Sequence, residues 1–75
     1  MVFEKVKKII LEVISIDESK IKLDAKLESD LGADSLDAVE IIMLIEDEFN
    51  ISLDDEVTQN IKTVQDLVKF IEERV

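Results

Sequence analysis

The sequence contains no cysteine, no histidine and no proline, and it has only one glycine. The absence of cysteine excludes disulfides and thiolate metal sites, and it fits a cytoplasmic protein. The absence of histidine removes the usual general base and the commonest transition-metal ligand. The longest purely apolar run, 41–45, is too short for insertion across a membrane. So few turn-forming residues favour a helical bundle over a β domain.

Cations are also scarce, because 9 lysines and arginines face 19 acids and give a formal net charge of −10. This balance disfavours nucleic acid and anionic membranes as partners, since phosphate binding requires a basic surface. Between Leu27 and Ile61 there is no cation, while eleven acids occur: Glu28, Asp30, Asp34, Asp37, Glu40, Glu46, Asp47, Glu48, Asp54, Asp55 and Glu56. This region predicts attraction to basic proteins, and a surface that only aids solubility is the alternative.

Apolar residues recur at three- and four-residue spacing in three segments, which is the pattern of helices that bury one face. The first helix is predicted from Val2 to Ile14, the second from Ser35 or Leu36 to Phe49, and the last after an N-cap at Thr63. A short helix of weaker pattern is predicted over 55–60. We therefore expect residues 1–75 to form one all-α domain, a small bundle of three main helices plus one short helix.

The predicted core comes from one face of each main helix. It consists of Phe3, Val6, Ile10 and Val13 in the first, Ala38, Ile41, Ile42, Ile45 and Phe49 in the second, and Val64, Leu67, Val68, Ile71 and Val75 in the last. The long loop 15–34 between the first two helices has no helical period. We expect four apolar residues to pin it to the core: Ile16, Ile21, Leu23 and Leu27. Long loops in small domains are uncommon and are often functional.

The second helix has more apolar residues than one buried face requires. On a helical wheel, a second row lies opposite the predicted core face. This row, the docking row, consists of Leu36, Val39 and Met43, and the acids that flank it are Glu40, Glu46 and Asp47. We interpret it as a surface that a partner covers, with scattered surface apolar residues as the alternative. Acids at 46–48 also oppose the helix dipole, which suggests function rather than local stability.

Ser35 stands at the predicted start of the second helix, where it or Asp34 is the expected N-cap. Catalysis by this serine is disfavoured, because no histidine can complete a triad and Asp37 replaces the second glycine of a G-x-S-x-G elbow. An EF-hand loop beginning at Asp30 also fails, since Ile41 occupies the position of the bidentate glutamate, and no metal site is predicted. A displayed serine without a base indicates a site of modification.

The segment Leu31-Gly32-Ala33-Asp34-Ser35-Leu36-Asp37, followed by Ala38-Val39-Glu40, strongly resembles the attachment motif of acyl carrier proteins. The likeness covers nearly the whole chain. It includes the length, the acidic balance, the order of the helices, Glu46-Asp47-Glu48-Phe49 at the end of the second helix, and Ile61-Lys62-Thr63-Val64 before the last. Family members often have proline in the connector before the short helix, and its absence here leaves the start of that helix open.

The resemblance implies that the Ser35 hydroxyl carries 4′-phosphopantetheine, taken from coenzyme A. The arm would bring the thiol that this chain lacks and hold acyl groups as thioesters. The resemblance also implies that phosphopantetheinyl transferase (holo-carrier synthase) recognises Asp34 and Asp37. Fatty acid synthesis enzymes with basic docking patches would contact the docking row and its flanking acids in small, transient interfaces. The chain would then be a monomeric carrier of type II fatty-acid synthesis and not an enzyme.

In this family the acyl chain can fold back between the helices, and five residues are candidates to line that cavity: Val6, Leu27, Ile45, Ile61 and Leu67. Two kinds of alternative function stay open. A polyketide, peptidyl or D-alanyl carrier protein would share the chemistry in another pathway. A non-covalent acidic docking module would need neither Ser35 nor an imported thiol.

Overall fold

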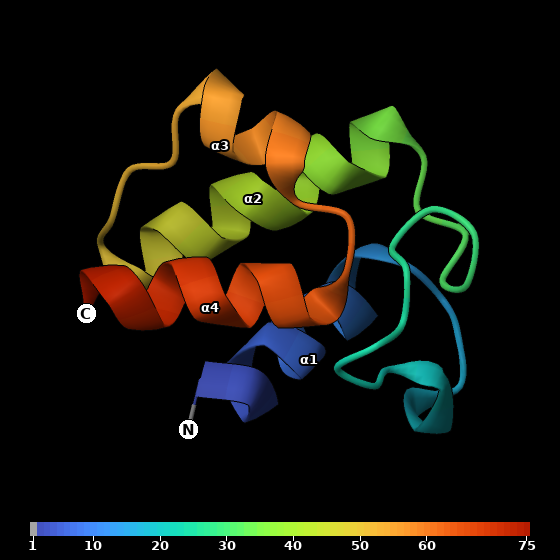
Figure 1. Ribbon diagram of the computed structural model, residues 1–75. Helices are drawn as coiled ribbons and strands as arrows, with labels where there is room; N and C mark the ends of the chain where they lie inside the picture. The colour runs from blue at the N-terminus through green and yellow to red at the C-terminus, as the bar shows by residue number, and fades with distance from the viewer. Residues whose placement is uncertain (1) are drawn as a thin grey trace.

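The computed structural model describes residues 2–75, apart from the side chain of Asp55. It contains four α-helices, α1 (Val2–Val13), α2 (Ser35–Phe49), α3 (Asp55–Asn60) and α4 (Val64–Arg74), and a short 3-10 helix, η1 (Glu18–Lys20) (Figure 1). The all-α prediction is confirmed, and the predicted ends of the helices are reproduced to within a residue. η1 was not predicted. Met1, which belongs to the predicted domain 1–75, lies outside the described residues.

The core forms where α1 packs against both α2 and α4 (Figure 1). Its fully buried side chains are Val6, Ile10, Ile41, Ile45, Val64, Leu67 and Ile71. The predicted Phe3, Val13, Ala38 and Phe49 are half-buried. The prediction was wrong for Val75, which is 68% exposed, because α4 ends at Arg74 and the terminal residue does not continue its buried face. No helix among the described residues is long and apolar enough to cross a membrane.

The long loop is attached to the segment between α3 and α4 by backbone hydrogen bonds. The N–H of Leu27 donates to the carbonyl of Lys62 over 3.0 Å, and the N–H of Val64 donates to that of Ala25 over 3.0 Å. Ile21 and Leu27 are buried as predicted, and Ile16 is half-buried. Leu23 is a correction, because its side chain is 44% exposed. Its carbonyl holds the loop instead by accepting from the N–H of Gln65 at 2.8 Å.

Side-chain caps fix where the helices start. Asp54 caps α3 by accepting from the N–H of Val57 at 2.9 Å, so this helix begins without a proline. Thr63 and Asp66 form a reciprocal capping box at α4, which confirms the predicted cap. The Asp66 carboxylate also accepts from the N–H of Lys62 at 2.9 Å. This bond is the largest cause of a pKa of Asp66 below its ordinary value of 3.8. Partial burial of the carboxylate acts in the opposite direction, and the bond from the N–H of Thr63 lowers the pKa further.

Candidate functional site

The segment 31–37 combines buried anchors with displayed side chains. Leu31 and Ala33 are buried, while Asp34, Ser35 and Leu36 are exposed. Gly32, between the two anchors, has a φ of +72°, a left-handed conformation that glycine adopts without strain. The anchors therefore hold the backbone against the core directly before the point where Ser35 is presented to solvent.

Asp34, rather than Ser35, is the N-cap of α2. Its Oδ1 accepts from the N–H of Asp37 at 2.9 Å, and the Asp37 Oδ2 accepts from the N–H of Asp34 at 3.4 Å. The two acids that the family resemblance assigned to transferase recognition thus form a capping box. The N–H groups of Ser35 and Leu36 have no acceptor inside the helix and lie at its positive end.

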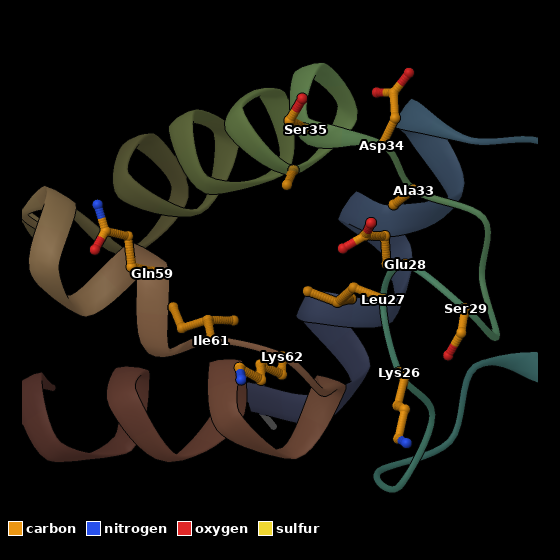
Figure 2. Close-up of a pocket in the computed structure, with 11 residues that line it drawn as sticks. Lys26, Leu27, Glu28, Ser29, Ala33, Asp34, Ser35, Gln59, Ile61 and Lys62 are labelled. Atoms are coloured by element: carbon orange, nitrogen blue, oxygen red, sulfur yellow. The ribbon is translucent and has the colours of Figure 1, made fainter.

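An open cleft of about 860 Å³ lies beside Ser35 (Figure 2). Its apolar lining comes from Leu27, Ala33, Ala38 and Ile61, and its polar lining from Lys26, Glu28, Ser29, Asp34, Ser35, Gln59 and Lys62. Figure 2 shows Ser35 at the rim, with Leu27 and Ile61 projecting toward one another from the loop and from the end of α3. The displayed serine therefore lies at the edge of a cleft whose walls include apolar side chains.

Two of the five residues named as candidates for the acyl cavity, Leu27 and Ile61, line this cleft. The other three, Val6, Ile45 and Leu67, are fully buried in the core, so the acyl cavity stays a prediction. The polar lining, including Gln59 and Lys62, was not predicted, because it arises where the loop lies against the α3–α4 turn. That approach depends on backbone hydrogen bonds, which leave no periodic pattern in the sequence.

The docking row is exposed, as predicted. Leu36 is 79%, Val39 51% and Met43 62% exposed, although all three belong to a 15-residue helix whose opposite face is buried. The flanking acids Glu40 and Asp47 are exposed as well. The docking row and these two acids thus form one accessible surface along α2.

The other acids near the end of α2 have local partners. The Oε2 of Glu46 accepts from the backbone N–H of Leu53 at 2.8 Å, and Glu48 lies 3.8 Å from the ammonium of Lys5. The interpretation that acids at 46–48 bring no local stability is therefore wrong for Glu46, while the exposed Lys5–Glu48 pair contributes little. The contact between Lys5 and Glu48 could have been anticipated, because Lys5 belongs to the helix that packs against α2. The contact between Glu46 and Leu53 could not, because it depends on the path of the connector.

The site fits a phosphate ester better than a catalytic centre. The chain has no histidine to activate Ser35. The α2 N-terminus offers N–H groups and a positive dipole end to a phosphate, and the cleft beside it offers apolar walls to an organic chain. Among the described residues, no three potential metal-ligating side chains converge. The fold and site define a class of protein that presents a covalently held group.

Comparisons with known proteins identify that class. A sequence model of the family described as a phosphopantetheine attachment site matches residues 4–71. A solved structure of a candidate acyl carrier protein from Mycobacterium tuberculosis matches over 100% of both chains, with 30% sequence identity and a TM-score of 0.89. The acyl carrier protein from Enterococcus faecalis is 32% identical over 99% of this chain and 94% of that chain, with a TM-score of 0.82.

The chain therefore belongs to the acyl carrier proteins, whose domain holds a phosphopantetheine attachment site. Members of this family are carriers rather than catalysts, and their cofactor is 4′-phosphopantetheine. A carrier of this kind interacts with the transferase that modifies it and with the enzymes that use its cargo. The thiol chemistry that the composition excludes thus enters with the cofactor.

Proposed function

We propose that Ser35 is the residue that holds the 4′-phosphopantetheine arm. The observation that carries this proposal is the position of its exposed hydroxyl at the positive end of α2, on the rim of the cleft. The arm, when bound, supplies the thiol that holds an acyl group. The protein's own part is to present the hydroxyl for modification, to stabilise the phosphate with the α2 N-terminus, and to shelter apolar cargo between Leu27 and Ile61.

We further propose that the cargo is a growing acyl chain of type II fatty-acid synthesis, in the cytoplasm. The residues of segment 31–37 support this pathway through their family resemblance. Peptidyl carriers more often have a second glycine at the position of Ala33, which here is buried against the core. On this proposal residues 1–75 act as one acyl-carrier-like domain and as a monomer.

The surface of α2 supports a proposal about partners. Phosphopantetheinyl transferase and separate fatty acid synthesis enzymes would place apolar pockets over the docking row and basic groups against the exposed acids of its rim, Glu40 and Asp47. Glu46 was expected to join them, but it is half-buried and bonded to the N–H of Leu53. Asp34 and Asp37 would add to recognition by the transferase next to the modified serine. Because a carrier must leave each enzyme, such interfaces are small, and rim charges act mainly on association rate.

Intact-mass spectrometry tests the attachment proposal. The purified protein is incubated with coenzyme A, magnesium and a broad-specificity phosphopantetheinyl transferase. We expect one added arm on the wild type and none on Ser35→Ala. Ser29→Ala is the matched control, since Ser29 is also exposed and also lines the cleft. Loss of the added mass in Ser29→Ala, or its persistence in Ser35→Ala, would show that another residue is modified.

The pathway needs a second assay with the modified protein. We expect a malonyl-transferring enzyme and a condensing enzyme of fatty-acid synthesis to load and extend a chain on it. Ligases that activate D-alanine or other amino acids should leave it unloaded. Loading by an amino-acid ligase without loading by the malonyl-transferring enzyme would contradict the fatty-acid assignment and support a peptidyl or D-alanyl carrier.

A further inference from the structure

Glu46 differs from the other acids beside the docking row. Glu40 and Asp47 are exposed, whereas Glu46 is half-buried and its Oε2 accepts from the N–H of Leu53 at 2.8 Å. Seven positions separate these two residues, so the bond spans the turn from α2 into the connector. A hydrogen bond with an ionised acceptor is stronger than a neutral one, and partial burial reduces competition from water.

The connector fixed by this bond leads directly into α3. Leu53 is buried, and Asp54 is the N-cap of α3. With only six residues, α3 is too short to be stable alone, so its position depends on what holds its two ends. The buried Leu53 lies before it and the buried Ile61 lies after it.

The far end of α3 forms one wall of the cleft. Gln59 and Ile61 both line the space beside Ser35, and Figure 2 shows them on the side of the cleft opposite the loop. A displacement of α3 would therefore change the distance between Ile61 and Leu27. The hydrogen bond from Leu53 to Glu46 thus links α2 to the start of α3, and the end of α3 lines the cleft.

We infer that Glu46 is a positioning residue that holds α3 as the wall of the cargo cleft, while Glu40 and Asp47 supply the direct anionic contacts to a basic partner. The assignment to a cargo cleft and a docking surface rests on the proposed function. The physical reason is that a partner that turned the Glu46 side chain toward itself would break the bond from the N–H of Leu53. Glu40 and Asp47 are exposed and carry no such cost.

Amide hydrogen exchange of the unmodified protein tests the positioning role. Glu46→Ala should raise the exchange rates of Leu53, Val57, Thr58 and Ile61 by about tenfold, because local opening of α3 becomes easier. Exchange in α1 and α4 should stay within about twofold. Glu46→Gln, which keeps an acceptor of the same shape, should restore much of the protection. Asp47→Ala removes the same charge from the neighbouring position and should leave α3 unchanged.

Transferase kinetics test the division of labour among the acids. Asp47→Asn and Glu40→Gln should raise KM for the carrier, and Glu46→Gln should change it by less than about twofold. The inference is overturned if Glu46→Gln raises KM as much as Asp47→Asn, or if Glu46→Ala speeds exchange equally in all helices or in none. If Glu46→Ala does not fold, Glu46→Asp, with its shorter side chain, takes its place.

The exchange measurement needs no attached arm, so its outcome is independent of whether Ser35 is modified. Failure of the wild type to accept the arm would count against the proposed function alone. Normal loading of the wild type with unchanged α3 exchange in Glu46→Ala would count against the positioning role alone.

Discussion

Five of the seven residues 31–37 have a structural task. Two apolar side chains anchor the backbone, one glycine allows a left-handed turn, and two acids close a capping box around Ser35. Only Ser35 and Leu36 face solvent without a role in packing or capping. Most of the segment therefore serves to position the Ser35 hydroxyl, which we propose as the attachment point.

Asp34 allows its capping role to be separated from its proposed recognition role. Asp34→Ala should lower the free energy of unfolding by about 1 kcal/mol, because the N–H of Asp37 loses its acceptor. Asp34→Asn keeps an N-capping side chain and should cost much less. Urea denaturation measures both. If the transferase recognises the charge of Asp34, it should modify both variants more slowly than the wild type. Modification of Asp34→Asn at the wild-type rate would show that the charge is not recognised.

At the scale of elements, α2 has one face buried in the core and an exposed face that we propose as the surface for partners. Val39→Ala and Met43→Ala should leave the melting temperature nearly unchanged, since both side chains are mostly exposed. Both should raise KM for the transferase. Leu23→Ala is the matched control, because Leu23 is an exposed apolar residue outside α2. An equal effect of Leu23→Ala and Met43→Ala on KM would refute the docking row.

The start of α4 should make stability depend on pH. The N–H of Lys62, with that of Thr63, holds the pKa of Asp66 below 3.8, so the ionised form is favoured by folding. The stabilisation is complete above that value and is lost as pH falls through the lowered pKa. Asp66→Asn should therefore cost about 1 kcal/mol at neutral pH and progressively less below the ordinary pKa.

Chemical denaturation at a series of pH values measures this dependence. Glu73→Gln removes the same charge from the exposed surface of α4 and serves as the control. If the difference in free energy of unfolding between Asp66→Asn and wild type stays constant from neutral to acid pH, ionisation of Asp66 does not stabilise this cap.

The elements were predictable because their signals are local. Apolar spacing predicted the helices, and Thr63 as an N-cap predicted the start of α4. The cleft was not predictable to the same degree, since it is formed where distant segments meet. Leu27 and Ile61 belong to it only because backbone bonds hold the loop against the α3–α4 turn. The role of Glu46 was missed for a similar reason, because its partner is a backbone N–H seven residues away.

At the scale of the whole molecule, the net charge of −10 is a source of self-repulsion. The described side chains form two ion pairs, Lys5–Glu48 and Lys7–Glu18, which leave most acids uncompensated. The melting temperature should therefore rise as sodium chloride is increased from about 10 mM to about 150 mM, where the screening length falls from about 30 Å to about 8 Å. A melting temperature indifferent to salt would show that repulsion contributes little.

The same charge distribution links stability to function. Acids concentrated along α2 repel one another in the isolated chain, and on the proposed function they would attract basic enzymes to the surface that carries the docking row. The cleft and the proposed attachment serine lie at the start of that same helix. On the proposed function, a partner that docks on α2 would therefore be close to the cargo without a large interface.

The most direct test of the central claim is to locate the arm on the wild-type protein. After modification, cleavage following glutamate yields the peptide 29–40, which contains two serines, Ser29 and Ser35. Fragmentation of this peptide by tandem mass spectrometry should place the whole phosphopantetheine mass on Ser35. An arm found on Ser29 or on another peptide, or a protein that never gains the arm, would contradict the account.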